Sequence, residues 1–532
     1  MLWLTVDRYR PFVIVLAVIG GLMLAATLFY PFGYDQAVFS VGGEMVLHGK
    51  IPYRDFLDTK QPLIFYLYAA AIGLFGRHEW SIHLFDIFYQ LFAAYYFFRI
   101  LRRELSFEIS LIAVSLTLIL YAGSGFWMTC EAESFAILPS LLLVDMTHRT
   151  VTSKRLAKAQ FALEYGLMAG VAAISLVLLK FTLVLGAFAA MVFVLSRPGI
   201  NGKIKWRYSI APTASSIALT LLCILALWWA GALHPFLQSL GWLFHYGAIG
   251  NTHGSIFEQF FLIFPERLIY SSSVAMFVLG IVGIVLFLKK RNSSPPKPLL
   301  SLLLFTGVFQ LLGVLAERKI EFPYQYTRAL WAFTPFMAMG LTALGGTLGR
   351  IRPSAAWAKW VAWVVCIPFV VWLSPLARIF SQTIPWVAIA LSRKDASAEV
   401  QRRVPDYFSG EQQEVADYLA SRLGPRDEFF FWGNDEGIYF FSNTLPQTMC
   451  LTATPFRTSF TPPEWKATLL TQLSSEPPKY LIAEFGDARP YITGSPLDSY
   501  QSLLAWNGME SFLATNYARD TTIGHFNIFR KL

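Results

Sequence analysis

The sequence predicts a polytopic α-helical membrane protein that carries a soluble α/β domain at its C-terminal end, and three observations support this fold class. Hydrophobic residues make up 55% of the 532 residues and charged residues 14%, whereas roughly one-quarter of the residues in soluble domains are charged. The mean hydropathy is +0.49. Long apolar runs recur up to residue 377, and beyond residue 394 they shorten while charge and proline increase. We therefore expect a transmembrane domain at 1–393 and a soluble domain at 394–532.

Eleven apolar runs are expected to form transmembrane helices, because about 20 apolar residues cross the hydrocarbon core of a bilayer. They lie at 12–30, 80–98, 107–122, 134–147, 161–178, 181–196, 209–230, 268–288, 299–315, 329–348 and 357–377. A further run at 62–76 is short for a span, and we expect an interfacial helix there. The N-terminal residues show no signal-peptide cleavage pattern, so 12–30 is expected to be an uncleaved first span.

The distribution of basic residues predicts the orientation. With 62–76 outside the bilayer, one set of alternate loops collects most of the lysines and arginines, for example Arg99, Arg102 and Arg103. The basic side of a membrane protein is usually the cytoplasmic side. The N-terminus is therefore expected in the cytoplasm of a bacterial cell, and the C-terminal domain outside the cytoplasmic membrane. These short basic clusters do not form the single stripe with interleaved aromatics that nucleic-acid binding requires, so no nucleic-acid partner is expected.

The C-terminal region has the alternating pattern of an α/β domain. Periodic apolar residues predict helices at 411–423 and 463–473, and short apolar runs predict strands at 428–432, 480–484 and 522–529. Gly424-Pro425 marks the end of the first of these helices.

The first outward loop, 31–79, contains the most unusual charges. Asp35 follows the first span and Phe32-Gly33-Tyr34 directly, so its carboxylate should lie at the membrane boundary beside aromatic groups. Partial desolvation raises the basicity of a carboxylate, which suits a general base. The structural alternative is a helix N-cap for 36–47. The two roles are compatible, since a capping loop can also present a base.

Lys60 belongs to the second charged element of this loop, Asp58-Thr59-Lys60-Gln61-Pro62-Leu63. Pro62 stands where a helix would begin, and a cation beside a helix N-terminus forms an anion site. Asp55 and Asp58 are expected to orient Lys60 or to contact hydroxyl groups. The alternative is a lysine that reaches along the interface and pairs with a carboxylate.

Two later outward loops supply further candidates. Glu131 and Glu133 precede the fourth span, and each is either a second carboxylate over the same cavity or an ordinary acid at a helix N-terminus. Arg328, flanked by Tyr324 and Tyr326, could bind a phosphate through two hydrogen bonds while the rings cover a lipid or a sugar. The alternative is an aromatic belt with an interfacial arginine. The histidines and cysteines show no metal-binding spacing, so no metal ligands are predicted.

Three features together resemble the GT-C superfamily of membrane glycosyltransferases. They are an Asp directly after the first span, an acid-x-Lys-x-Pro-Leu element that leads into Phe65-Tyr66-Leu67-Tyr68, and a late Tyr/Arg loop before a span. The sequence is most similar to the bacterial branch that includes protein O-mannosyltransferases, lipid A aminoarabinose transferases and rhizobial lipopolysaccharide glycosyltransferases. The resemblance covers roughly 12–377, and the C-terminal domain is similar to an appendage that many members carry.

The resemblance implies a polyprenyl-phosphate-linked sugar as donor and a glycolipid, polysaccharide or protein as acceptor. Asp35 would be the catalytic base, Asp58 a companion acid and Lys60 a ligand of the donor phosphate. Arg328, with Tyr324 or Tyr326, would be a late phosphate ligand.

One position departs from the family pattern, since Lys60-Gln61-Pro62 stands where Lys-Pro-Pro is usual. One-step transfer from such a donor implies inversion. The chemistry requires no cofactor, although family members differ in their use of a divalent metal.

Two other classes of function remain open. A transporter or flippase of lipid-linked sugars should place polar groups near the bilayer midplane and show repeated halves, but here the charges concentrate in outward loops. An enzyme similar to O-antigen ligases would use a diphosphate-linked donor. A noncatalytic surface receptor is a more distant alternative.

Overall fold

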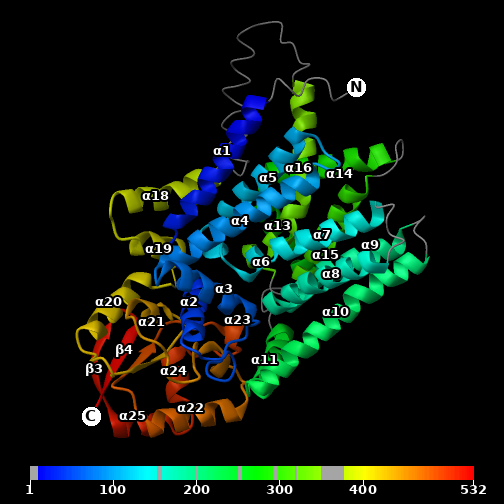
Figure 1. The fold of residues 1–532 in the computed structure, drawn as a ribbon. Helices are drawn as coiled ribbons and strands as arrows, with labels where there is room; N and C mark the ends of the chain where they lie inside the picture. The colour runs from blue at the N-terminus through cyan, green and yellow to red at the C-terminus, as the bar shows by residue number, and fades with distance from the viewer. Residues whose placement is uncertain are drawn as a thin grey trace. The chain divides into compact units, whose positions relative to one another are not determined.

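The structure is a computed structural model that describes eight stretches of the chain, 10–152, 159–197, 202–249, 255–291, 297–317, 320–348, 377–405 and 407–532. The chain divides into two compact units, each built from three segments (Figure 1). Residues 1–30, 83–221 and 255–388 form one, which we call the helical unit. Residues 31–82, 222–254 and 389–532 form the other, which we call the α/β unit.

The helical unit contains most of the apolar helices. Its longer elements are α1 (Arg10–Ala26), most of α4 (Glu79–Leu101), α5 (Phe107–Ala122), α7 (Ile137–Thr152), α8 (Ala159–Leu179), α9 (Leu185–Ser196), most of α10 (Gly202–Trp229), α13 (Phe264–Ser272), α14 (Val274–Arg291), α15 (Pro298–Glu317) and α16 (Thr327–Leu348). Short elements connect them: η2 (Thr27–Phe29), η3 (Phe126–Met128), α6 (Ala132–Phe135), η4 (Phe181–Val184), α12 (Ile256–Glu258), η5 (Gln259–Ile263), η6 (Pro323–Tyr326), η7 (Ile379–Thr383) and most of α18 (Ile384–Leu391). The core lies where α5, α15 and α16 pack together, around buried residues such as Trp331.

Four helices in the described part of the chain are long and apolar enough to cross a membrane. They are Arg10–Phe29, Glu79–Leu101, Lys205–Trp229 and Pro298–Glu317. Several other predicted spans form shorter apolar helices, such as α5. The predicted count of eleven is therefore not confirmed, and most of the run at 357–377 lies outside the described residues.

The predicted span at 268–288 is not one straight helix. It is divided into α13 and α14 at Ser273, and the flanking helices are bent by 97°. Ser273 has φ +66°, a left-handed backbone conformation that ends a right-handed helix. The serine run 271–273 interrupts the apolar pattern and marks this break in the sequence.

The α/β unit contains a four-stranded sheet with the order β1-β2-β4-β3. Its strands are β1 (Phe429–Trp432), β2 (Tyr480–Glu484), β3 (Tyr517–Ile523) and β4 (Phe526–Lys531). The helices that precede the C-terminal region are α2 (Tyr34–Leu47), α3 (Leu63–Phe75) and α11 (Leu233–Ile249). Those of the C-terminal region are α19 (Ser397–Arg403), α20 (Ser409–Ala420), α21 (Gly437–Phe441), η8 (Thr454–Phe456), α22 (Pro463–Ser475), α23 (Pro490–Thr493), α24 (Ser499–Leu504) and α25 (Met509–Asn516). β1 and β2 are parallel, and β4 is antiparallel to both β2 and β3.

Both buried strands predicted from the sequence are confirmed, but the terminal strand is corrected. The predicted strand at 522–529 is a hairpin, since β3 ends at Ile523 and β4 begins at Phe526. Gly524 has φ +48° and, with His525, forms the two-residue connection. A glycine between two β-rich runs is a hairpin signal that the sequence contains.

Three chain segments share the core of the α/β unit. Leu57 from the first loop and Trp242 from α11 pack with Trp432 and Phe456 of the C-terminal region. The backbone N–H of Leu57 donates a hydrogen bond to Met449 O at 2.8 Å, and α21 packs against α2 (Figure 1). The predicted boundary at 393/394 lies close to the division at 388/389, but the C-terminal unit also takes in 31–82 and 222–254.

Candidate active site

Asp35 and Lys60 form an ion pair in the α/β unit. Lys60 Nζ lies 3.1 Å from Asp35 Oδ2, and the two side chains are 29% and 28% exposed. Asp35 lies in the first turn of α2, whose N-cap is Gly33. The alternative in which Asp35 itself caps this helix is therefore wrong, and its carboxylate contacts the lysine instead. An acid in a first turn is also favoured by the helix dipole.

Close packing of α2 on α3 places the two charges together. A Cβ atom on Gly43 would lie 2.8 Å from Ala69 N, which is backbone that cannot move aside easily. The two helices approach this closely because position 43 has no side chain. Pro62 is the N-cap of α3, as predicted, so Lys60 precedes the N-terminus of that helix.

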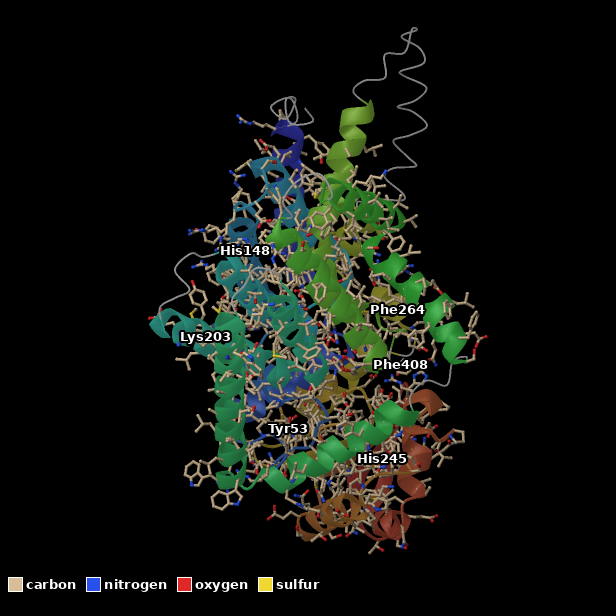
Figure 2. The ribbon with its side chains drawn as sticks, turned by 90° about the vertical axis from the view of Figure 1, so that its right-hand side faces the viewer. Tyr53, His148, Lys203, His245, Phe264 and Phe408 are labelled. Carbon is tan, nitrogen blue, oxygen red and sulfur yellow. The ribbon has the colours of Figure 1, made fainter. Side chains whose placement is uncertain are left out.

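The loop before α3 holds the backbone of Lys60 on both sides. Asp58 Oδ1 accepts a hydrogen bond from Lys60 N at 2.7 Å, and Tyr53 Oη donates one to Lys60 O at 2.7 Å. Tyr53, labelled in Figure 2, is a buried residue. Its backbone has φ +71°. Burial raises the pKa of Asp58 to about 6, although the N–H and the charge of Lys60 act in the opposite direction. Asp58 therefore orients Lys60 through the backbone.

Asp55 has other partners than Lys60 in this loop. Its carboxylate accepts hydrogen bonds from Arg54 at 2.9 and 2.7 Å and from Ile51 N at 2.7 Å. It closes the turn that precedes Asp58. The expectation that Asp55 orients Lys60 directly is thus replaced by a structural role.

A second charged cluster lies in the helical unit, where Arg328 and Lys180 share two carboxylates. Arg328 Nη2 lies 2.7 Å from Glu133 Oε1 and 2.6 Å from Glu317 Oε1. Lys180 Nζ lies 2.7 Å from Glu133 Oε1 and 2.6 Å from Glu317 Oε2. Thr182 Oγ1 accepts from Arg328 Nη1 at 2.9 Å. Burial alone would raise the pKa of Glu133, but the charges of Lys180 and Arg328 lower it to about 2.

Arg328 is fully buried in this cluster, and its amino groups already have partners. Its side chain is 0% exposed, whereas Lys180 is 20% exposed. A phosphate at Arg328 Nη2 would have to compete with Glu133 and Glu317. The contact between Arg328 and a phosphate stays a prediction, and in this conformation Lys180 is the more accessible cation of the pair.

The other predicted residues of the helical unit have structural contacts. Tyr326 Oη donates to Ile320 O at 3.0 Å, and the ring of Tyr324 lies under Lys180 Nζ at 5.7 Å from its centroid. Glu131 is buried at the N-cap of α6, where its N–H donates to Ser134 Oγ at 3.1 Å. Of the two glutamates, Glu133 joins the charged cluster and Glu131 stands at the helix end.

Within the described residues, no group of three or more His, Cys, Asp or Glu side chains is arranged to hold a metal ion. His245 lies on α11 (Figure 2), where its Nδ1 is 2.8 Å from Gly241 O. His253 lies outside the described residues.

No protein-family model matches the sequence. No curated protein matches it significantly. Several solved structures match over almost the whole chain, and two of them are structures of ArnT. ArnT from Cupriavidus metallidurans bound to undecaprenyl phosphate is 12% identical, with a TM-score of 0.57 and coverage of 99% of this chain and 98% of that chain. The same protein in the apo state is 13% identical, with a TM-score of 0.59 and the same coverage.

The chain has the fold of these two ArnT structures. The described part of the chain is mostly helical and ends in a small four-stranded sheet, so that part of the predicted fold class is confirmed. The resemblance drawn from the sequence motifs is confirmed at the level of the fold.

Sequence reasoning missed several partners of the charged residues. Glu317 and Thr182 come from segments far from Glu133 in the sequence, and nothing in their local pattern marks them as partners of Arg328. Arg489 was missed as well, although it contacts Tyr34, the neighbour of Asp35. Pairings of this kind depend on how distant segments pack, which local spacing does not encode.

Proposed function

We propose that this protein transfers a sugar from a polyprenyl-phosphate-linked donor to a glycolipid, polysaccharide or protein acceptor, with inversion, at the outer face of a bacterial cytoplasmic membrane. The observation that carries the proposal is the partly exposed Asp35–Lys60 pair at the N-termini of α2 and α3. A structure of similar fold is bound to undecaprenyl phosphate, which supports a lipid phosphate as leaving group.

Lys60 would bind the donor phosphate. Lys60 precedes the N-terminus of α3 in the chain, and the dipole of a helix N-terminus also favours an anion. Because an ammonium group has three donors, Lys60 can contact a phosphate oxygen while its backbone stays held by Asp58 and Tyr53. Contact with phosphate would draw Lys60 away from Asp35 and free that carboxylate for the acceptor.

Asp35 would act as the general base. The acceptor hydroxyl or amine gives its proton to the carboxylate and attacks the anomeric carbon of the sugar. The bond between that carbon and the phosphate oxygen breaks, and polyprenyl phosphate leaves with the electron pair. Lys60 stabilises the negative charge that develops on the leaving phosphate. A single displacement of this kind inverts the anomeric configuration.

Two variants separate the proposed roles. In full-length protein in nanodiscs, Asp35→Asn should lower kcat by at least about 100-fold and leave binding of the polyprenyl-phosphate sugar unchanged. Lys60→Gln should raise the KM for the donor by about 10-fold or more, since it removes a charged hydrogen bond, and should also lower kcat because the leaving phosphate loses a stabilising cation. Asp55→Asn, in the same loop but paired with Arg54, is the matched control and should retain activity.

Full transfer activity in the Asp35→Asn variant would contradict the proposal. The transporter alternative predicts that reconstituted vesicles move a lipid-linked sugar across the bilayer without forming a new glycosidic bond. A ligase-like enzyme would use a donor with a diphosphate link and reject the monophosphate.

A further inference from the structure

The residue beside the candidate base is held by the C-terminal part of the chain. Tyr34 is the first residue of α2, directly before Asp35, and it is buried. Arg489 Nη2 donates a hydrogen bond to Tyr34 Oη, and the guanidinium carbon lies 4.2 Å from the centroid of the tyrosine ring. One arginine thus contacts both the hydroxyl group and the face of this ring.

Aromatic residues of the C-terminal region also pack against the start of α2. The ring of Tyr407 packs edge-on against Tyr34 at 4.5 Å between centroids, and Phe440 of α21 packs against Phe32 at 5.0 Å. Glu79 Oε1 accepts a hydrogen bond from Phe32 N at 3.1 Å. The turn that leads into α2 therefore packs against residues more than 350 positions later in the chain. It also contacts a residue at the end of its own loop.

The position of Arg489 follows from the sheet. It lies in the segment after β2 and directly before α23, next to the segment that follows the parallel strand β1. The buried carboxyl groups of Asp435, Glu436 and Glu484 lie close enough for its charge to act on them. The charge of Arg489 therefore lowers the pKa values of these buried acids, although burial raises them more, while its guanidinium group contacts Tyr34.

We propose that Arg489 is a positioning residue for the transfer reaction, because through Tyr34 it fixes the first turn of α2 and with it the carboxylate of Asp35. This inference rests on the proposed function and extends it to the C-terminal region. An error of about 1 Å in the place of a catalytic group can cost about 100-fold in rate. Lys60 is held by Asp58 and Tyr53, so donor binding does not depend on Arg489.

The test compares two conservative variants and their combination in full-length protein in nanodiscs. Arg489→Lys keeps the charge that faces the buried acids but loses the planar group that stacks on Tyr34. Tyr34→Phe keeps the ring and loses the hydroxyl. Arg457→Lys is the control, since Arg457 is an arginine of the same region that binds Asp487 at 2.7 Å and Ser499 at 2.6 Å instead of Tyr34.

We expect Arg489→Lys to lower kcat by about 10-fold and leave the donor KM within about 2-fold, which a general loss of structure would not do. Tyr34→Phe should lower kcat by a smaller factor. The double variant should be no slower than Arg489→Lys within about 2-fold, because both changes break one contact. Arg457→Lys should retain the wild-type kcat even if its melting temperature falls.

Wild-type kcat in folded Arg489→Lys would overturn the inference, and so would equal losses in Arg489→Lys and Arg457→Lys. Strictly multiplicative effects in the double variant would overturn it as well. If Asp35→Asn is inactive in the same assay while Arg489→Lys is fully active, only the positioning role fails. If the wild-type protein transfers no sugar from polyprenyl-phosphate donors, the proposed function fails and the inference with it.

Discussion

At the scale of single residues, burial separates carboxylates that look alike in the sequence. Asp35 and Asp58 lie in one loop region, but the side chain of Asp35 is 28% exposed and ion-paired, whereas Asp58 is 5% exposed. Asp55 pairs with its sequence neighbour Arg54. The three acids are therefore expected to respond differently to substitution.

Asp58 should make stability depend on pH. Its pKa is about 6 in the folded protein and 3.8 without the fold, so the native state binds more protons between these values and stability falls as the pH rises through this window. Asp58→Asn keeps an oxygen that can accept from Lys60 N and removes the buried charge. The variant should gain up to roughly 3 kcal/mol over the wild type at pH 7.5 and little at pH 4. Melting temperatures of both proteins at the two pH values check this, and a pH-independent difference would contradict it.

Glu133 should stabilise the folded protein by keeping the charged cluster around Arg328 neutral. Glu133→Gln leaves two cations opposite Glu317, and an uncompensated buried charge typically costs about 3–5 kcal/mol. We expect a marked fall in melting temperature, and the double variant Glu133→Gln/Lys180→Gln should recover part of it because the cluster becomes neutral again. An unchanged melting temperature in Glu133→Gln would show that the ion pairs contribute nothing.

At the scale of elements, the closeness of α2 and α3 decides the geometry of the candidate site. Asp35 and Lys60 belong to different elements, and their distance of 3.1 Å depends on how these helices pack. Gly43 makes the contact possible, since a side chain there would meet the backbone of Tyr68 and Ala69. The sequence pattern predicted both helices but not this contact.

Gly43→Val should therefore separate the two helices and disable transfer. Overpacking of this kind costs typically about 1–3 kcal/mol, and we expect a lower melting temperature together with a kcat loss larger than about 10-fold. Gly73→Ala is the control on the same helix pair, because its Cβ would lie 3.5 Å from Leu47, an ordinary contact. Equal activity of Gly43→Val and Gly73→Ala would contradict the role of this packing.

At the scale of the whole molecule, the α/β unit joins parts of the chain that the sequence presents as separate. The first loop, α11 and the C-terminal region share one core. If the C-terminal region is outside the cytoplasm, as we propose, the loop with Asp35 and Lys60 must be on the same side. All three segments of the α/β unit therefore lie on the same side of the membrane.

A reporter fused after Leu532 tests this topology. A reporter that is active only outside the cytoplasm should be active in this fusion, and the same reporter fused at the N-terminus should be inactive. A cytoplasmic result would contradict the proposed orientation and would place the loop with Asp35 and Lys60 in the cytoplasm as well.

The sequence by itself determined the fold class, the two buried strands and the loop residues of the candidate site, because hydropathy, periodicity and a proline before a helix are local signals. The broken helix at Ser273 and the hairpin at Gly524 also had local signals, but weak ones. Only the tertiary structure decided which charges meet. Asp35 pairs with Lys60, Arg328 is enclosed by Glu133 and Glu317, and Arg489 contacts Tyr34. Ion pairs between distant segments depend on packing in three dimensions, and no local pattern specifies them.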